Sequence, residues 1–306
     1  MKQSQFARAL WYGILGALFF AFTFIFNRSM NLSGGSWMWS ASLRYLFSLP
    51  MLAILAWRKG ELAGVLAAIK KTPLTWLVWS TVGFGLFYGP LSLASIYGES
   101  WFVAATWQIT ILAGLLLTPL FGQRIPGKQL LMTLVILLGI IFIQIPYFGS
   151  GLGSGVVRAS LLILLAAFAY PLGNRKMMVH CKQDQLSTTQ RVFGMTLMST
   201  PSWLLLSVFA GADAGLPSGG QILQSLIVAV FSGVVATLLF FEATNLVKHN
   251  HKKLAVVEAT QAGEVLFTLL GGCLFLGDSL PSLLGFFGIA IVTIGIIGNS
   301  LLTGSD

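Results

Sequence analysis

The 306-residue chain is poor in charge: nine Asp and Glu and 18 Lys and Arg make up only 9% of it. A soluble globular domain has about 25% charged residues. The chain also has only two cysteines, Cys181 and Cys273, and three histidines. Two distant cysteines cannot build the disulfide scaffold of a small secreted domain, and we do not expect them to pair. The composition therefore excludes both a disulfide-stapled module and an ordinary soluble domain.

Sequence motifs for several chemistries are also missing. No Walker motif is present, so ATP-driven work by this chain alone is not expected. His249 and His251 could be a metal pair, but Lys248, Lys252 and Lys253 surround them with positive charge that opposes a cation. The glycine-rich segment 149–155 has no βαβ unit around it, which argues against a dinucleotide site. We predict no cofactor, no metal and no catalytic residues, and hence no enzyme.

Long hydrophobic runs fill the chain instead. Hydrophobic residues make up 56% of it, and the mean hydropathy is +0.85. Each run approaches the roughly 20 residues that cross a bilayer as a helix. We therefore predict an all-α polytopic membrane protein with ten transmembrane helices. The predicted spans are Leu10–Phe26, Trp37–Trp57, Leu74–Ile96, Trp101–Phe121, Leu130–Phe148, Val156–Gly173, Val192–Ala210, Ile222–Thr244, Leu254–Leu276 and Leu280–Leu302.

The basic residues predict the orientation of these spans. Of the 18 basic residues, 15 precede the first span or lie in alternate loops, all on one predicted side. The opposite side has only Arg28 and Arg158, and Arg44 lies inside a span. Cytoplasmic loops of membrane proteins are rich in Lys and Arg, so both termini are expected in the cytoplasm. The same loops explain the net charge of +9, and no nucleic-acid partner is needed.

A weak internal repeat divides the chain. Asn27-Arg28 recurs as Asn174-Arg175, and Arg44 matches Arg191 at the same offset of 147 residues. The segment 121–126 likewise recurs as 276–281. The alternative is that glycine, proline and Asn-Arg simply recur at helix ends. With five helices per repeat, residues 1–150 and 151–306 would have opposite orientations, and such inverted repeats are common in secondary transporters.

The chain resembles the drug/metabolite transporter superfamily over nearly its whole length. The arginine of Ser42-Leu43-Arg44-Tyr45-Leu46 and the endings at 120–126 and 275–280 carry this resemblance. Both endings are similar to the family's "LxGE" pattern, in which an acid follows the glycine. Asp278 keeps an acid there, whereas Gln123 departs from the pattern. Within the superfamily, the branch of multidrug resistance efflux transporters is the most similar.

The resemblance implies a secondary active transporter that exports a small organic solute, such as a drug-like cation or a metabolite, across the cytoplasmic membrane. Proton coupling is one option for its driving force. The alternatives are a carrier or exchanger of amino acids, other metabolites or nucleotide sugars and, more distantly, a membrane-embedded enzyme. The expected surroundings are a small-molecule substrate, the lipid bilayer and exchanged protons, with the chain as a monomer or weak dimer in the inner membrane.

Two charged residues inside predicted spans are the main site candidates. A charge at a helix centre costs about 2.5–3.5 kcal/mol on insertion scales, so Arg44 and Glu264 are expected to face a polar interior. Arg44 could instead extend toward the interface, and Glu264 could be a structural acid held by Gln261. If Glu264 is not structural, it is the candidate for proton coupling. The other cavity candidates are Trp107, Gln108, Tyr88 and Gln261, and the hinge candidates are Pro90 and Pro171.

Residues near the ends of spans have simpler interpretations. Trp37, Trp57 and Trp101 are expected as anchors at the membrane interface. Glu99 follows the third span and is expected in solvent. The fifth and tenth spans lack internal charge, which favours positions at the periphery.

Overall fold

The structure is a computed structural model that describes residues 2–122, 124–148, 153–247 and 250–303. All of its regular elements in these ranges are helical. Gln123, the first four residues of the predicted glycine-rich linker, Lys248 and His249 lie outside the described residues.

The elements of the first half begin with a long helix and end with another. In chain order they are α1 (Lys2–Leu32), α2 (Trp37–Arg58), α3 (Leu62–Lys71), α4 (Pro73–Ser80), η1 (Thr81–Gly85), α5 (Leu86–Ala94), α6 (Ser100–Trp107), α7 (Ile109–Leu116), η2 (Thr118–Phe121) and α8 (Gly127–Phe148). Here η1 is π-helical and η2 is a 3₁₀ helix.

The second half has a closely similar order of elements. They are α9 (Gly153–Gln183), α10 (Thr188–Ala214), α11 (Gly219–Ile227), η3 (Val228–Ala236), α12 (Thr237–Val247), α13 (His251–Ala259), η4 (Thr260–Ala262), α14 (Gly263–Gly271), η5 (Gly272–Leu276) and α15 (Leu283–Thr303). In this half η3 and η5 are π-helical and η4 is a 3₁₀ helix.

Nine helices in the described ranges are long and apolar enough to cross a membrane, which supports the prediction of a multi-pass membrane protein. The predicted span Trp101–Phe121 is instead a shorter apolar helix, Ser100–Leu116, with a local change of hydrogen bonding at Gln108. A helix rises about 1.5 Å per residue, so this segment falls short of a full hydrocarbon thickness. The count of ten crossings therefore remains a prediction.

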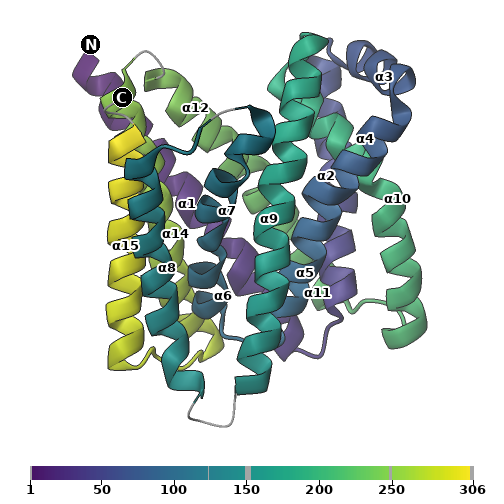
Figure 1. Cartoon of the computed structure of the whole chain (residues 1–306). Coiled ribbons are helices and arrows are strands. Elements are labelled where there is room, and N and C mark those ends of the chain that lie inside the picture. Colours follow the sequence, from purple (N-terminus) through teal and green to yellow (C-terminus); the bar gives the residue numbers. More distant parts are fainter. Residues whose placement is uncertain (1, 123, 149–152, 248–249, 304–306) are drawn as a thin grey trace.

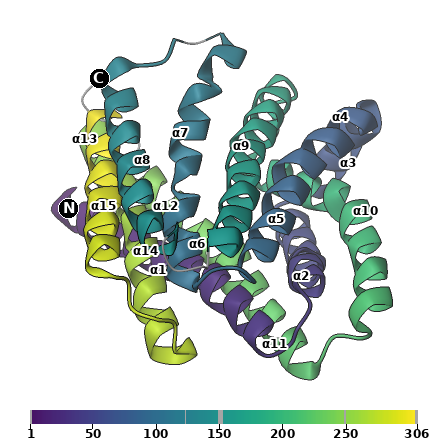
Figure 2. The ribbon, with the colours of Figure 1, turned by 60° about the horizontal axis from the view of Figure 1, so that its bottom comes forward.

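The helices stand side by side in a bundle (Figure 1). α1 begins and α15 ends at the same end of the bundle, which we call the termini end, and α8 ends and α9 begins at the opposite end. α8 and α15 pack against each other at one edge, and α10 lies at the other edge in both views (Figures 1 and 2). α1 crosses the interior, where it contacts α12, η3 and α14.

Local sequence explains several helix boundaries. Ser187 precedes α10 and forms a capping box with Gln190. The Ser187 side chain accepts from the Gln190 backbone N–H, and the Gln190 side chain accepts from the Ser187 backbone N–H. Such reciprocal bonds satisfy backbone donors that a helix start leaves free. Gly122 and Gly277 follow η2 and η5 with φ of 73° and 68°. Only glycine adopts this left-handed conformation without strain, which explains the glycine in both "LxG" endings.

Glycine also allows α8 and α15 to approach closely. A Cβ atom on Gly288 would lie 2.6 Å from the Gly139 carbonyl oxygen, so the two backbones touch at this crossing. Small residues at such crossings are typical of packing between membrane helices. The outer sides of both helices keep exposed apolar residues, such as Leu131, Ile141 and Ile294. This agrees with the predicted peripheral position of the fifth and tenth spans.

Several predicted boundaries were wrong. α9 continues to Gln183 and α10 already begins at Thr188, so Arg175 and Arg191 lie in helices rather than in the predicted loop. Arg175 is stabilised there because its Nη1 donates to the Gly114 carbonyl at 2.5 Å. Trp101 is not an interfacial anchor: it is buried, and its indole donates to the Ser279 carbonyl at 3.0 Å. Trp57 is largely exposed, as expected for an anchor.

Candidate functional site

Arg44 of α2 lies inside the bundle. Its guanidinium carbon is 4.1 Å from the centre of the Tyr88 ring, and Nη2 donates to Ser232 Oγ at 3.3 Å. Tyr88 comes from α5 and Ser232 from the π-helical segment η3, so three helices meet at this arginine. Nη1 is buried and has no hydrogen-bond partner in the described part of the chain. The positive charge is thus held by neutral groups and keeps unused donor capacity.

Further bonds fix the surroundings of Arg44. The Tyr88 hydroxyl donates to Asn27 Oδ1 at 3.2 Å, which sets the ring against the guanidinium. Ser232 also bonds to Thr23 Oγ1 at 2.6 Å. Tyr45 stacks on Trp203 with ring centres 4.5 Å apart. Because α1 contributes Asn27 and Thr23, the position of Arg44 depends on contacts with α1 as well as with α5 and η3.

Glu264 of α14 is the acid that faces this region. Its carboxylate lies within hydrogen-bonding reach of the Gln108 side chain and interacts electrostatically with Arg44. No ion pair joins Glu264 to Arg44 in the part of the chain that the structure describes. Gln108 is buried at the junction of α6 and α7, where the helix changes its hydrogen bonding. The two predicted residues Gln108 and Glu264 are therefore neighbours.

Three aromatic rings form a cluster beside these charges. Phe87 lies between Trp107 and Tyr170, with ring centres 5.0 Å and 4.7 Å away, and Trp107 and Tyr170 meet edge to face at 5.8 Å. Trp107 is 9% exposed, whereas Tyr170 keeps 38% of its surface accessible although it lies deep in the bundle. Arg44 and Glu264 combine depth and partial accessibility in the same way. These side chains are therefore only partly covered by the surrounding helices.

A cavity of about 660 Å³ lies between α2, α10, η3, α12 and α13. Near the termini end its wall includes Lys59, Thr188 and Glu258. Deeper along α2 and η3 it includes Leu52 and Gly233. Gly233 directly follows Ser232, the hydrogen-bond partner of Arg44. The cavity therefore leads from the termini end toward the charged cluster, although the cluster is not part of its wall.

Other predicted site residues lie nearby without direct contact to the charges. Gln261 lies in the 3₁₀ segment η4, and its Nε2 is buried without a hydrogen-bond partner. Among the described residues, no hydrogen bond joins it to Glu264. Pro171 lies inside α9 and cannot donate to the Ala167 carbonyl, which instead accepts from Thr110 at 3.2 Å. Pro90 lies inside α5, one turn after the π-helical segment η1.

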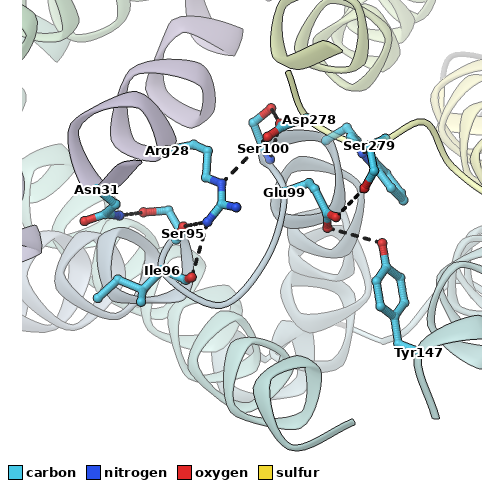
Figure 3. A network of polar contacts seen from close by, with 10 residues as sticks. Arg28, Asn31, Ser95, Ile96, Glu99, Ser100, Tyr147, Asp278 and Ser279 are labelled. Atoms are coloured by element: carbon cyan, nitrogen blue, oxygen red, sulfur yellow. Dashed lines mark hydrogen bonds and ion pairs between the residues drawn. The ribbon is translucent and has the colours of Figure 1, made fainter. Parts of the chain in front are cut away.

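The end opposite the termini is held by a second polar cluster (Figure 3). Arg28 lies 3.7 Å from the Asp278 carboxylate and donates to the Ser95 and Ile96 carbonyls at 3.2 and 3.3 Å. Asp278 accepts from both the backbone and the hydroxyl of Ser100, at 2.9 and 2.5 Å. These bonds join α1, α5, α6 and the segment after η5, which belong to both halves of the chain.

Glu99 extends the same cluster. It accepts from Tyr147 of α8 at 3.2 Å and from Ser279 at 2.6 Å (Figure 3). The prediction that Glu99 simply ends in solvent was therefore wrong. We call the set Arg28, Glu99, Ser100, Tyr147, Asp278 and Ser279 the closing cluster.

Sequence reasoning missed Tyr170, Ser232 and the closing cluster as interacting groups. Tyr170 directly precedes the hinge candidate Pro171 without any charge of its own, and Ser232 is one serine among many in apolar helices. Arg28 and Asp278 were assigned to opposite repeats, each at a helix end. The recurrence of Asn27-Arg28 at an internal helix end was a signal that could have drawn attention to Arg28.

The fold and the buried charges define a multi-pass helical membrane protein with a polar interior. The chain matches the family described as "EmrE: Putative multidrug resistance efflux transporter" over residues 7–305, and it belongs to that family. This confirms the resemblance seen in its sequence motifs. The family is one of transporters, and the chain is assigned to that class.

Two relatives share much of its sequence. It is 47% identical to "Uncharacterized protein YjlA" of Bacillus subtilis (strain 168) over 303 residues, which cover 95% of this chain and 93% of that protein. It is 42% identical to an "Uncharacterized 42.1 kDa protein" of Shouchella clausii over 279 residues, covering 88% and 73%. One solved crystal structure shares the fold with a TM-score of 0.64 over 97% of this chain and 98% of that chain, at 14% identity.

Proposed function

We propose that the protein is a secondary active transporter that exports a small organic solute across the cytoplasmic membrane. The observation that carries this proposal is the pair Arg44 and Glu264, which hold opposite charges inside the bundle without forming an ion pair. Buried charges without a direct partner are costly in a structural role, and in membrane helices they mark solute or ion pathways. The solute binds between these charges and the aromatic cluster.

We further propose ten crossings arranged as two inverted halves, residues 1–150 and 151–306. Four pairs of features support this arrangement. α1 and α9 each have 31 residues, and the third long helix of each half contains a π-helical segment. The α-helical pattern is interrupted at Gln108 and at η4, and Gly122 and Gly277 end the fourth helices. In this arrangement Ser100–Leu116 is the short fourth crossing.

The two ends of the bundle suggest how access alternates. The closing cluster ties both halves together at the end opposite the termini, whereas the cavity reaches the termini end. With both termini in the cytoplasm, as the basic loops predict, this conformation admits solute from the cytoplasm. Export then requires the closing cluster to separate while the cavity closes, and Pro90 and Pro171 supply bends for that motion.

Glu264 couples the cycle to protons in this proposal. Its carboxylate takes a proton when the site faces outward and releases it when the site faces inward, so that solute and proton move in opposite directions. Gln108 orients the carboxylate, and Arg44 supplies the opposite charge of the site. Trp107, Tyr88 and Gln261 complete the polar and aromatic lining.

The test is proton movement in liposomes that contain the purified protein and a pH-sensitive dye in the lumen. A panel of organic cations, amino acids and sugar nucleotides is added outside acid-loaded vesicles. We expect at least one class to raise the lumenal pH faster than in protein-free vesicles. If no compound of the panel does so in sealed vesicles, the proposed function is wrong.

A further inference from the structure

Resting on the proposed function, we propose that the solute is a zwitterion, with a carboxylate that binds Arg44 and an ammonium group that binds between Glu264 and the ring cluster of Phe87, Trp107 and Tyr170. The family description names efflux but assigns no such site. Three observations carry the inference: the unused donor of Arg44, the separation of Arg44 from Glu264, and the aromatic rings next to the acid.

The Arg44 side presents a site for an anion. One edge of its guanidinium is held by Ser232 and one face by the Tyr88 ring, while Nη1 is buried without a partner. A planar guanidinium held in this way can donate two parallel hydrogen bonds to a carboxylate. The ion pairs found in the described ranges, Arg28–Asp278 and Lys71–Asp184, do not include Arg44. A carboxylate from the solute would supply the missing partner of the buried cation.

The Glu264 side presents a site for a cation. The carboxylate has the Gln108 amide as a neutral neighbour, so it retains its capacity to accept from a charged donor. The aromatic cluster lies near the acid through Trp107, which directly precedes Gln108, and its Tyr170 ring interacts electrostatically with Arg191, Arg44 and Glu264. Ammonium groups are attracted to the faces of tryptophan and tyrosine rings. Tyr170 keeps enough accessible surface for such a contact.

The two opposite charges favour one molecule that carries both groups. Arg44 and Glu264 act on each other electrostatically, and no ion pair joins them among the described residues. A simple cation would satisfy Glu264 yet add positive charge beside Arg44. A simple anion would leave Glu264 without a counter-charge. A zwitterion supplies an anionic group to Arg44 and a cationic group to Glu264.

The probes are two matched sets built on alanine and on phenylalanine. Each set contains the free amino acid, its methyl ester, which lacks the carboxylate, and its N-acetyl derivative, which lacks the ammonium. Binding to the purified full-length protein is measured as the concentration-dependent rise of its unfolding temperature. We expect at least one free amino acid to bind about tenfold or more tightly than both of its derivatives, since each loses one charge-assisted contact.

Two variants with matched controls test the assigned contacts. Arg44→Gln should remove the preference for the free amino acid over its methyl ester, and Glu264→Gln the preference over its N-acetyl derivative. Arg158→Gln removes an exposed arginine near the Tyr97 ring, and Asp213→Asn removes an exposed acid at the end of α10. Both controls should keep the wild-type order of the three probes. If Arg44→Gln does not fold, the probe order of the wild-type protein still decides.

The outcomes separate this inference from the proposed function. If a methyl ester binds as tightly as its free amino acid, or no free amino acid of either size binds, the zwitterion site is wrong. Transport of organic cations in the dye assay would then still support the proposed function. If no panel compound moves protons, the transporter proposal fails, even where a free amino acid binds as predicted.

Discussion

Arg44 and Glu264 share a property that ordinary core residues lack: neutral groups hold each side chain, and its charge has no ion-pair partner among the described residues. Ser232 and the Tyr88 ring hold the arginine, and Gln108 lies beside the acid. By contrast, Arg28 and Asp278 at the closed end meet each other directly. At the scale of residues, Arg44 and Glu264 therefore keep the capacity to bind a charged ligand, whereas Arg28 and Asp278 at the closed end already bind each other.

A surface pair gives a prediction on pH dependence. Lys71 donates to Asp184 at 2.9 Å, which holds the pKa of that carboxyl below its usual value. A carboxyl whose pKa is lower in the folded than in the unfolded protein stabilises the fold at pH values above its unfolded-state pKa. This stabilisation is lost as the pH falls through the pKa of the folded state. Lys71→Gln should therefore lower the unfolding temperature slightly at pH 7 but not in acid where Asp184 is protonated. The control is Lys70→Gln, an exposed neighbour; an equal loss in both variants would show that the pair contributes nothing specific.

Several residues of the candidate site were predicted from the sequence, because a charged residue inside an apolar run is unusual and can be recognised without a structure. Arg44, Glu264 and Gln108 were identified in this way, and the structure places them near one another. Tyr170 and Ser232 could not be identified, since their importance comes from contacts with residues about 60 to 190 positions away. Arg28 and Glu99 were missed for the same reason: a charge at a helix end is usually solvated.

At the scale of elements, the π-helical and 3₁₀ segments interrupt helices that border the interior. η3 carries Ser232, η1 precedes Tyr88, and η4 precedes Glu264. Such interruptions often occur at functional sites because they redirect side chains within a helix. α8 and α15 lack π-helical or 3₁₀ segments and pack against each other through glycine. The irregular elements therefore contribute to the candidate site together with the regular helices α2 and α9, and the regular pair α8 and α15 forms a lipid-facing support.

The glycine crossing predicts a selective loss of stability. In Gly288→Ala the new methyl group would lie 2.6 Å from the Gly139 carbonyl and 2.9 Å from the Ile143 nitrogen, so the helices must separate. We expect a loss of about 1–3 kcal/mol, the usual cost of overpacking, measured by unfolding in detergent. Gly127→Ala is the control on α8, because no atom lies within 4 Å of its added methyl group. Equal stability of both variants would contradict the close crossing.

The closing cluster predicts a change in accessibility. Asp278→Asn removes the charge that faces Arg28 and accepts from Ser100, so the end opposite the termini should open more often. A cysteine at the buried position Ser92, in a protein without Cys181 and Cys273, should react about tenfold faster with a membrane-impermeant thiol reagent added from that side.

The control for this labelling is Asp184→Asn, which removes an acid at the termini end and should leave the rate at position 92 unchanged. An unchanged rate in Asp278→Asn would mean that the closing cluster does not hold that end shut. An equal increase in both variants would point to general loosening instead.

At the scale of the whole molecule, the account requires ten crossings with both termini in the cytoplasm. Single cysteines test this most simply. Positions Arg58 and Lys128 should be labelled only from the cytoplasm, and Ser33, Ile96 and Leu216 only from outside. Ile96 and Lys128 flank the short helix Ser100–Leu116, so their labelling decides whether that segment crosses. Labelling of both from one side would leave nine crossings and reject the inverted halves.

The fold itself was largely accessible from the sequence, since most predicted spans overlap the observed long apolar helices. The fourth span was the exception. Its apolar run extends to Phe121, but α-helical hydrogen bonding ends at Leu116 and η2 follows. Thr118-Pro119 causes this change, because proline cannot donate within a helix interior. A hydropathy profile reports apolar composition, so it does not detect the missing backbone donor of the proline.

The most direct measurement of the central claim is uptake of a labelled solute, chosen from the panel, into liposomes with an acidic lumen. Protons leave as solute enters, so wild-type protein should accumulate solute above the external concentration, and dissipating the pH gradient should abolish this. Glu264→Gln should remain folded yet fail to accumulate the solute, even at concentrations high enough to offset weaker binding. Wild-type vesicles that accumulate no more than protein-free ones would contradict the transporter. A Glu264→Gln protein with wild-type rate and unchanged pH dependence would show that Glu264 is structural.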